Sequence, residues 1–434
     1  MFTRAYSQST VCTPSRSCFL TGRYPVTTRC RQNGQNIPEE EILITRELKD
    51  RGYSCGLFGK LHISAAASGT ERRIDDGYDV FKWSHGATAK HGGEWIKFLT
   101  ENGKTFDEVY KESDVLLSRE VSDYKLHQTT WCFDQAIDFI KNSDAPFCAS
   151  INPFAVHDPF DFLPEFYKNY NPEEMPDPRY QPEELDRNPY PQRYRHEQKH
   201  QYYGDFESKS YDNHTAKQRR EMKAAYYATI EHIDFEVGKL LDYLERTNQR
   251  ENTLILFHAD HGELLGDHGL YRKGSFFYEP SVRIPFIASM PSLLPQNKQI
   301  DDLVGLIDIV PTIYEILGED IPKRVQGKSL IPLIRGDKNY KHRKGVYSEY
   351  YNANPKFFGH AGIYATMWRE DDYKIIVHHG AELGELYDLV NDPYEMTNLW
   401  NDSAYFNKKM ELMKECFDAS VFTMDPMPER TELF

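Results

Sequence analysis

Residues 12 to 23 read Cys-Thr-Pro-Ser-Arg-Ser-Cys-Phe-Leu-Thr-Gly-Arg, and they predict a short helix with a cysteine directly in front of it. Pro14 suits the first helical position, because the N–H that proline lacks would be unpaired there anyway. Thr13 is then the expected N-cap, and Gly22 is the expected residue just past the helix end.

Cys12 would face the N-terminus of this helix, where unpaired N–H groups favour an anion. Arg16, one turn further on, adds a cation with forked donors. The pattern therefore predicts a site for an oxyanion such as sulfate or phosphate. A Cys-x-Pro element alone is more typical of a buried structural cysteine beside a surface helix. Cys18, inside the helix, is expected in the core.

The composition is that of a large folded protein. The chain has 434 residues, of which 39% are hydrophobic and 14% aromatic, too many for a disordered chain. A net charge of −15 argues against a nucleic-acid partner but not against an anionic substrate, because the local field matters more. The seven cysteines show no paired spacing, so no disulfide framework is expected. No apolar run is long enough to span a bilayer, and no signal peptide is recognisable.

Strands and helices alternate along most of the chain, as is typical of a doubly wound α/β sheet flanked by helices. Apolar periodicity predicts helices over 39–51, 129–142, 218–247 and 308–317, and strands over 53–58, 147–151 and 253–257. Past residue 336 the pattern predicts short strands over 344–350, 363–368 and 373–378 and a helix over 403–417. These suggest a smaller antiparallel sheet.

We therefore predict a catalytic α/β domain over residues 1–335 and an α+β subdomain over residues 336–434. Residues 159–216 are rich in Pro, Tyr, Asn, Arg and Glu and lack periodicity. A segment of this length is too long for an inert loop, so we expect it near the mouth of the active site.

Polar residues follow three of the predicted strands, where α/β folds usually carry their chemistry. Lys60 and His62 can point into one pocket if their segment is extended, although surface Lys and hydrogen-bonded His residues are commoner. His157 lies among prolines, where a rigid ring is as readily a loop-capped residue as a functional one. Asp260 and His261 can reach one ion where the backbone turns.

Gly262 would permit that turn. Asp-His-Gly by itself is modest support for a metal site. Asp267 and His268, which follow closely, are expected at the rim or in packing rather than as ligands.

The full stretch Cys-x-Pro-Ser-Arg-x-x-x-Leu-Thr-Gly-Arg resembles the signature of the type I sulfatases, the formylglycine-dependent sulfatases of the alkaline phosphatase superfamily. Other stretches resemble further blocks of that family: Phe-Gly-Lys-Leu-His at 58–62, Val-His-Asp-Pro at 156–159, Ala-Asp-His-Gly-Glu at 259–263 and Leu-Tyr-Asp-Leu at 386–389. Two of them depart from the pattern, since Leu61 replaces a Trp and Val156 replaces a Pro. The likeness covers nearly the whole chain and implies a sulfatase-like fold.

The resemblance also implies a role for each matching residue. Cys12 would be oxidised to formylglycine, whose hydrated aldehyde is the nucleophile, and Arg16 would support the hydrate. Lys60 and His62 would hold formylglycine and the sulfate, with His62 taking up a proton when the aldehyde returns. His157 would protonate the leaving oxygen.

Lys273 would bind the sulfate, and Asp260 and His261, together with the converted Cys12, would bind a metal. Ca²⁺ is the expected ion, with Mn²⁺ or Mg²⁺ as rivals because one ligand is a histidine. The implied partners are a formylglycine-generating maturation enzyme and a sulfated small-molecule or glycan substrate, with no nucleic acid and no membrane span.

In the family, an earlier strand ends in two adjacent Asp residues that also bind the metal, and we expect both that strand and its Asp pair to be absent before Cys12. Three explanations are open: a truncated chain, a misassigned start or a degenerate member. Since three protein groups fall short of what Ca²⁺ prefers, we expect weak metal binding and poor turnover by the chain as given.

The predicted function is sulfate-ester hydrolysis, with sulfated sugars as the expected substrates because they are prevalent in the family. One alternative is a phosphodiesterase or phosphonate monoester hydrolase of the same superfamily. The other is a catalytically impaired, sulfatase-like protein that binds glycans.

Overall fold

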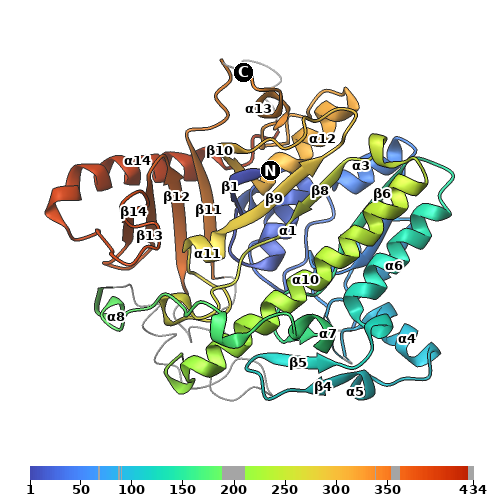
Figure 1. The fold of residues 1–434 in the computed structure, drawn as a ribbon. Coiled ribbons are helices and arrows are strands. Elements are labelled where there is room, and N and C mark those ends of the chain that lie inside the picture. The colour runs from blue at the N-terminus through green and yellow to red at the C-terminus, as the bar shows by residue number, and fades with distance from the viewer. Residues whose placement is uncertain are drawn as a thin grey trace. The chain divides into compact units, whose positions relative to one another are not determined.

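The computed structural model describes residues 1–66, 69–86, 88, 90–187, 211–337, 339–352 and 362–428 (Figure 1). The chain divides into two compact units. The first comprises Met1–Glu41, Arg179–Tyr211 and Leu254–Phe434, and the second comprises Ile42–Pro178 and Asp212–Thr253. The domain boundary predicted at residue 336 stays a prediction.

The main sheet of the first unit has four strands in the order β10-β1-β9-β8. They are β1 (Phe2–Tyr6), β8 (Ile255–His258), β9 (Arg283–Ser289) and β10 (Ile300–Gly305). β1 pairs in parallel with β10, where Ala5 lies opposite Val304, and antiparallel with β9, where Ala5 lies opposite Ile284. The sheet is therefore mixed.

The helices of the first unit are α1 (Cys12–Thr21), α2 (Pro25–Thr28), α8 (Glu184–Arg187), α11 (Glu279–Val282), α12 (Ile309–Leu317), α13 (Ile331–Arg335) and α14 (Phe406–Phe422). α1 begins two residues earlier than predicted, because Val11 is its N-cap. The Thr13 N–H is bonded instead by the Asn33 side chain at 3.0 Å. Pro14 still falls in the first turn, where helix N–H groups lack intrahelical partners.

The end of α1 is as predicted. Gly22 follows the helix with a φ of 71°, and its N–H donates to the Cys18 carbonyl at 2.8 Å. A Cβ at this position would lie 2.9 Å from the Cβ of Val310, so the site excludes larger residues as well as favouring glycine.

The second sheet of the first unit confirms the predicted C-terminal antiparallel sheet. Its strands run in sequence order as β11 (Gly345–Tyr351), β12 (Tyr364–Glu370), β13 (Tyr373–His378) and β14 (Glu385–Asp388). α14 packs across it (Figure 1), with Leu412 and Cys416 in one core cluster with Trp368 and Ile375.

The second unit contains a parallel sheet in the order β3-β2-β6 and a small sheet of β4, β5 and β7. The strands are β2 (Ser54–Gly59), β3 (Val80–Trp83), β4 (Tyr110–Glu112), β5 (Ser118–Val121), β6 (Phe147–Asn152) and β7 (Phe160–Phe162). The helices are α3 (Ile44–Asp50), α4 (Gly93–Glu101), α5 (Phe106–Val109), α6 (Gln128–Lys141), α7 (Pro164–Tyr167) and α10 (Ala216–Arg246). The fold is mixed α/β, as predicted.

The helix predicted over 39–51 is shorter in the structure, since α3 begins only at Ile44. Glu41 is drawn into an ion pair with Arg23 at 3.3 Å, and Leu43 is extended, so the residues before Ile44 cannot join the helix. Of the segment 159–216, residues 188–210 lie outside the described residues, and its place near the active-site mouth stays a prediction.

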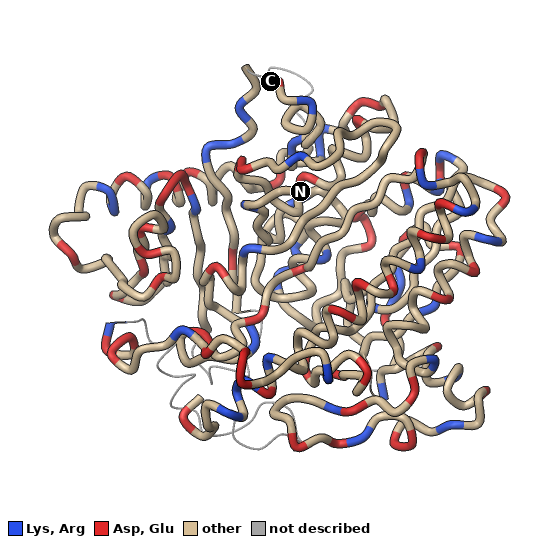
Figure 2. The backbone as a smooth tube through the Cα atoms, in the orientation of Figure 1, with Lys and Arg blue, Asp and Glu red and all other residues tan. Residues whose placement is uncertain are grey.

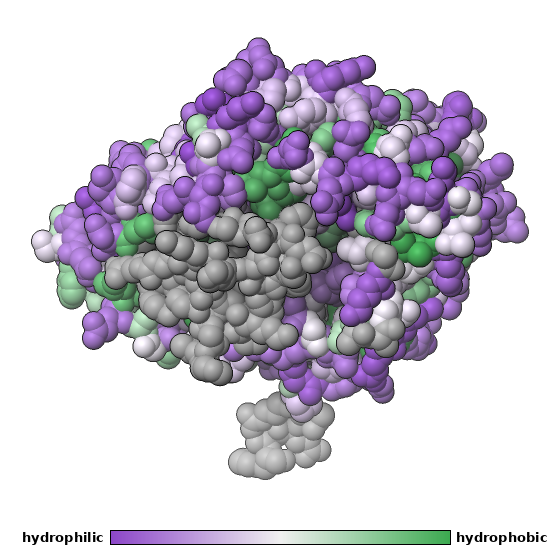
Figure 3. All heavy atoms as spheres, turned by 90° about the horizontal axis from the view of Figure 1, so that it is seen from below, coloured by the Kyte–Doolittle hydropathy of each residue, from purple (hydrophilic) through white to green (hydrophobic). Residues whose placement is uncertain are grey.

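The surface is polar and its charges are mixed. Acidic and basic residues interleave along α10 and α14 (Figure 2). On the face shown in Figure 3, hydrophilic atoms predominate and hydrophobic ones form small separate patches. Among the described residues, every helix is too short or too polar to cross a membrane.

Candidate active site

The predicted site residues of the first unit meet at the start of α1. The chain leaves β1 at Tyr6 and enters α1 at Cys12, and all ten residues of this helix are buried. The Cys12 Sγ lies 3.0 Å from Nε2 of His261, which comes from the loop after β8. The Arg16 Nε lies 2.8 Å from Oδ2 of Asp260. The structure therefore brings together two segments that are nearly 250 residues apart in sequence.

A second contact fixes the same loop, and the sequence analysis did not single it out. The Ser15 hydroxyl donates to the backbone carbonyl of Asp260 at 2.6 Å. Arg16 and Ser15 therefore hold one residue by its side chain and by its backbone. Ser15 is part of the motif, which was the only sign in the sequence that it mattered.

Three of these residues could hold a metal. Within the described residues, Cys12, Asp260 and His261 form a group whose ligand atoms all lie within 4.8 Å of one another. Nδ1 of His261 lies 2.8 Å from the Gly262 carbonyl, which makes Nδ1 the protonated nitrogen and turns Nε2 toward Cys12. The group can therefore present an imidazole nitrogen and a carboxylate to one ion.

Burial and the neighbouring charges act in opposite directions on the pKa of His261. Burial lowers the pKa of the His261 imidazole, but Asp260 and Cys12 raise it more, so that its pKa lies above the ordinary value. The positive charge of Lys273 opposes this rise, so Lys273 acts electrostatically on the same group. By contrast, burial lowers the pKa of His258 to about 4, which keeps that ring neutral.

Gly262 is needed at its position for a different reason from the one predicted. Its φ is not positive, and its N–H donates to the Ser281 carbonyl at 2.8 Å. A Cβ there would lie 1.9 Å from the Pro280 carbonyl oxygen. The glycine is therefore required by the close approach of two backbone segments.

Asp267 and His268 are packing residues, as expected. The His268 ring stacks on Tyr278 with ring centroids 3.6 Å apart, and its Nδ1 lies 2.7 Å from Oε2 of Glu184. The Asp267 carboxylate accepts the Arg179 N–H at 2.9 Å. Both residues fasten the segment that leads to Lys273.

Lys60 and His62 lie on one short segment of the second unit, directly after β2. Gly59 turns the chain with a φ of 104°, and the Lys60 N–H donates to the Asn152 carbonyl at 2.8 Å. The prediction for this pair required an extended segment. The segment is not extended, because His62 has a φ of 59°. A buried carboxylate, Glu71, binds the His62 N–H at 2.7 Å and stabilises this conformation.

His157 follows β6 in the second unit, and its ring is held by its own loop. Nδ1 lies 2.7 Å from the Asp158 carbonyl oxygen and 3.4 Å from the Asp158 carboxylate. The ring also stacks on Phe154 with centroids 4.8 Å apart. These contacts set the orientation of the ring and bring a negative charge close to it.

The sequence matches two family models. A model described as sulfatase matches residues 1–319, which is most of the chain. The chain belongs to the sulfatase family. A second model, described as N-sulphoglucosamine sulphohydrolase, C-terminal, matches residues 266–421.

Several curated relatives of this sulfatase-family chain are named as sulfatases. It is 28% identical over 444 residues to an arylsulfatase of Clostridium perfringens, covering 93% of this chain and 83% of the relative. It is 24% identical over 485 residues to an N-acetylglucosamine-6-O-sulfatase of Bacteroides thetaiotaomicron, covering 99% and 81%. The predicted family and the general class of ester hydrolase are thereby confirmed.

The fold is likewise that of the family. The structure of a phosphonate monoester hydrolase of Agrobacterium radiobacter superposes with a TM-score of 0.86 at 22% identity, covering 100% of this chain and 90% of that one. This likeness confirms the predicted fold class. The roles predicted for the individual site residues of this family member stay predictions.

Proposed function

We propose that this chain hydrolyses sulfate esters of carbohydrates, using a formylglycine made from Cys12 as its nucleophile. The observation that supports the proposal is the convergence of Cys12, Arg16, Asp260 and His261 in a chain that belongs to the sulfatase family. A thiol set against a histidine, beside a carboxylate that is ion-paired with a guanidinium, is unusual for a structural cysteine, which normally packs among apolar groups.

The donor set at the start of α1 would supply only part of the roughly six to eight ligands that Ca²⁺ prefers, so we expect the chain as given to bind a divalent cation weakly. Asp260 and His261 would hold it together with the oxygen that replaces the Cys12 sulfur, and we propose Ca²⁺, with Mn²⁺ or Mg²⁺ as rivals. A bound metal would neutralise charge on the sulfate and lower the pKa of the attacking hydroxyl. Arg16 would keep Asp260 ionised and oriented through the 2.8 Å ion pair.

Two lysines of the chain would balance the negative charge of the sulfate, and two histidines would transfer protons. Lys60 and Lys273 would balance the anionic sulfate. His157 would donate a proton from Nε2 to the leaving oxygen, since its Nδ1 is held by Asp158. His62 would accept the proton that is released when the aldehyde is restored.

The substrate class is supported by the relatives. One is named an N-acetylglucosamine-6-O-sulfatase, and the family model that matches residues 266–421 is named for N-sulphoglucosamine. We therefore propose sulfated amino sugars as substrates and a formylglycine-generating enzyme as a maturation partner.

The test is to express the chain with a formylglycine-generating enzyme and to assay an aryl sulfate, glucosamine 6-sulfate and an aryl phosphonate monoester side by side. Peptide mass spectrometry should show the thiol of Cys12 replaced by an aldehyde. Cys12→Ala should abolish hydrolysis. Cys18→Ala, a buried cysteine one turn and a half further along the same helix, should leave hydrolysis largely intact and is the matched control.

Two other results of these assays would change the proposed function. Faster turnover of the phosphonate ester would make the chain a phosphonate monoester hydrolase. Binding of sulfated sugars without turnover, despite complete conversion of Cys12, would make it a glycan-binding member of the family.

A further inference from the structure

One buried carboxylate gathers the segment that carries Lys60 and His62. The oxygens of Glu71 accept the backbone N–H groups of His62, Ile63 and Ser64 at 2.7, 2.5 and 2.7 Å. They also accept the indole N–H of Trp83 at 3.0 Å. Three successive backbone donors therefore converge on a single side chain.

The Glu71 carboxylate that makes these contacts is buried. Glu71 is 3% exposed, and burying a charged group costs free energy unless hydrogen bonds replace its water. Burial raises the pKa of Glu71, while the four N–H donors work against that rise. Hydrogen bonds to an ionised oxygen are about twice as strong as those between neutral groups, so four of them offset part of the cost, and the pKa of Glu71 stays above its ordinary value.

The segment held by Glu71 is in a conformation that it would not adopt unaided. His62 has a φ of 59°, in the left-handed region that costs a non-glycine residue of order 1 kcal/mol or more. In this conformation the His62 ring lies edge-on to the His85 ring, with centroids 4.3 Å apart. If the three N–H groups lost their contacts with Glu71, His62 would return to an ordinary φ. Its ring would then turn away from the His85 ring.

We propose that Glu71 is a positioning residue that sets the orientation of the His62 imidazole for sulfate-ester hydrolysis. The proposal rests on the proposed function, in which His62 accepts a proton. Glu71 itself would not touch the substrate. Its action would pass through the backbone of residues 62–64.

The decisive variant is Glu71→Gln, which keeps the size of the side chain but offers a single acceptor oxygen, so that an NH₂ group faces N–H donors. Trp83→Phe is the matched control, because it removes one donor to Glu71 and loosens a buried ring while leaving the three backbone contacts in place. Glu71→Asp, which retains the charge but withdraws it by one methylene, serves if the glutamine variant does not fold.

The first readout is hydrogen exchange of the intact protein. The amides of residues 62–64 should exchange slowly in the wild type and in Trp83→Phe, and at least tenfold faster in Glu71→Gln. Rapid exchange of these amides in the wild type would overturn the proposal, whatever the activity.

The second readout is a double-mutant comparison of turnover on an aryl sulfate. Glu71→Gln should lower kcat by about 10²-fold, within the range that a proton-transferring residue contributes, with KM changed less than threefold. Once His62→Ala is present, adding Glu71→Gln should cost less than twofold more. Losses that multiply in the double variant would show that Glu71 acts independently of His62 and would refute the positioning role.

The failures of the two proposals are separable. If the wild type, with Cys12 fully converted, hydrolyses no sulfate ester, the proposed function fails, and the exchange pattern still decides whether Glu71 holds the segment. If the wild type is active and His62→Ala is slow while Glu71→Gln is not, only the positioning role fails.

Discussion

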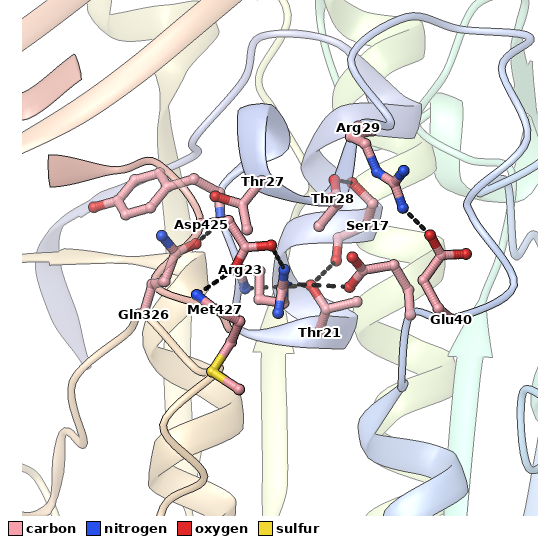
Figure 4. Close-up of polar contacts among 12 residues, drawn as sticks. Ser17, Thr21, Arg23, Thr27, Thr28, Arg29, Glu40, Gln326, Asp425 and Met427 are labelled. Carbon is pink, nitrogen blue, oxygen red and sulfur yellow. Dashed lines mark hydrogen bonds and ion pairs between the residues drawn. The ribbon is translucent and has the colours of Figure 1, made fainter. Parts of the chain in front are cut away.

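Arg23, the last residue of the motif, lies between two carboxylates at the far end of α1 (Figure 4). Its Nη2 lies 2.8 Å from Oδ2 of Asp425 and its Nε lies 3.3 Å from Oε2 of Glu41. The side chains of Arg23 and Glu41 are 9% and 6% exposed, whereas that of Asp425 is 43% exposed. The two ion pairs should therefore contribute very differently to stability.

We predict that Glu41→Gln lowers the free energy of unfolding by about 3 kcal/mol, because it leaves a buried guanidinium without its buried partner. Asp425→Asn should cost less than about 1 kcal/mol, because water screens the exposed carboxylate. Urea unfolding of the two variants measures the difference. Equal losses would mean that Arg23 does not depend on Glu41.

A second prediction at this scale concerns His157. If its ring donates a proton to the leaving oxygen, His157→Ala should slow esters with poor leaving groups by about 10²- to 10⁴-fold and activated aryl esters much less. Turnover of an alkyl sulfate and of a nitrophenyl sulfate by wild type and variant gives the comparison. The same loss on both substrates would remove the residue from this role.

At the residue scale, the sequence predicted contacts only where a motif named both partners. Cys12 and His261 belong to motif blocks, and the structure places them 3.0 Å apart. Glu71 belongs to none, because what it recognises is backbone N–H, which every residue except proline carries. A residue that binds backbone N–H groups needs no particular side chains around it, so the sequence contains no motif that reveals it.

At the scale of elements, length and periodicity decided what could be predicted. α6 and α10 have 14 and 31 residues, and both helices were predicted to within two residues at each end. β1 has only five residues, of which Thr3 and Arg4 are half-buried, so its alternation was too short to recognise. The strands β3, β4, β5, β7, β9, β10 and β14 were missed as well. Each exists because neighbouring strands complete its hydrogen bonds, which is information from the tertiary structure.

α10 and α6 are joined by a buried carboxylate whose ionisation should affect stability. Glu236 on α10 is fully buried and accepts the Thr130 hydroxyl of α6 at 2.9 Å and the Lys239 ammonium at 2.8 Å. Burial raises the pKa of Glu236. Hydrogen bonds from His232, Lys239 and Tyr124 lower the pKa by more than this, to about 2. The carboxylate therefore ionises more readily in the folded chain than in the unfolded one.

A depressed pKa stabilises the fold above the pKa of the unfolded chain, and this stabilisation is lost as the pH falls toward the folded value. We predict that Glu236→Gln lowers the free energy of unfolding by about 3 kcal/mol at pH 7. The difference from the wild type should shrink steadily between pH 5 and pH 3. Denaturant unfolding at several pH values measures it, and a gap that does not change with pH would contradict the assignment.

At the scale of the whole molecule, a buried ion network ties the two sheets of the first unit together. The Lys374 ammonium, on β13, is fully buried and lies 3.0 Å from Glu279 and 2.5 Å from Glu395. Tyr6, at the end of β1, donates to the other oxygen of Glu279 at 3.0 Å. The C-terminal sheet therefore supports the strand that leads to Cys12, and the family likeness likewise extends far past Asp260 and His261.

The complete burial of α1 has a consequence for when the enzyme can be made active. If Cys12 is converted to formylglycine as proposed, the converting enzyme must reach a residue in a helix whose ten residues are all buried in the folded chain. We predict that purified, folded, unconverted protein resists conversion, whereas a peptide spanning residues 8–24 or freshly diluted unfolded chain is converted. Mass spectrometry of the Cys12 peptide measures the yield.

If the conversion takes place as proposed, folding would compete with it, because a chain that folds first buries the Cys12 thiol in α1. The fraction of active molecules would then depend on the relative rates of conversion and folding. Variants that fold more slowly, with an unchanged active site, should carry more aldehyde, and colder or slower synthesis should shift the yield in the same direction.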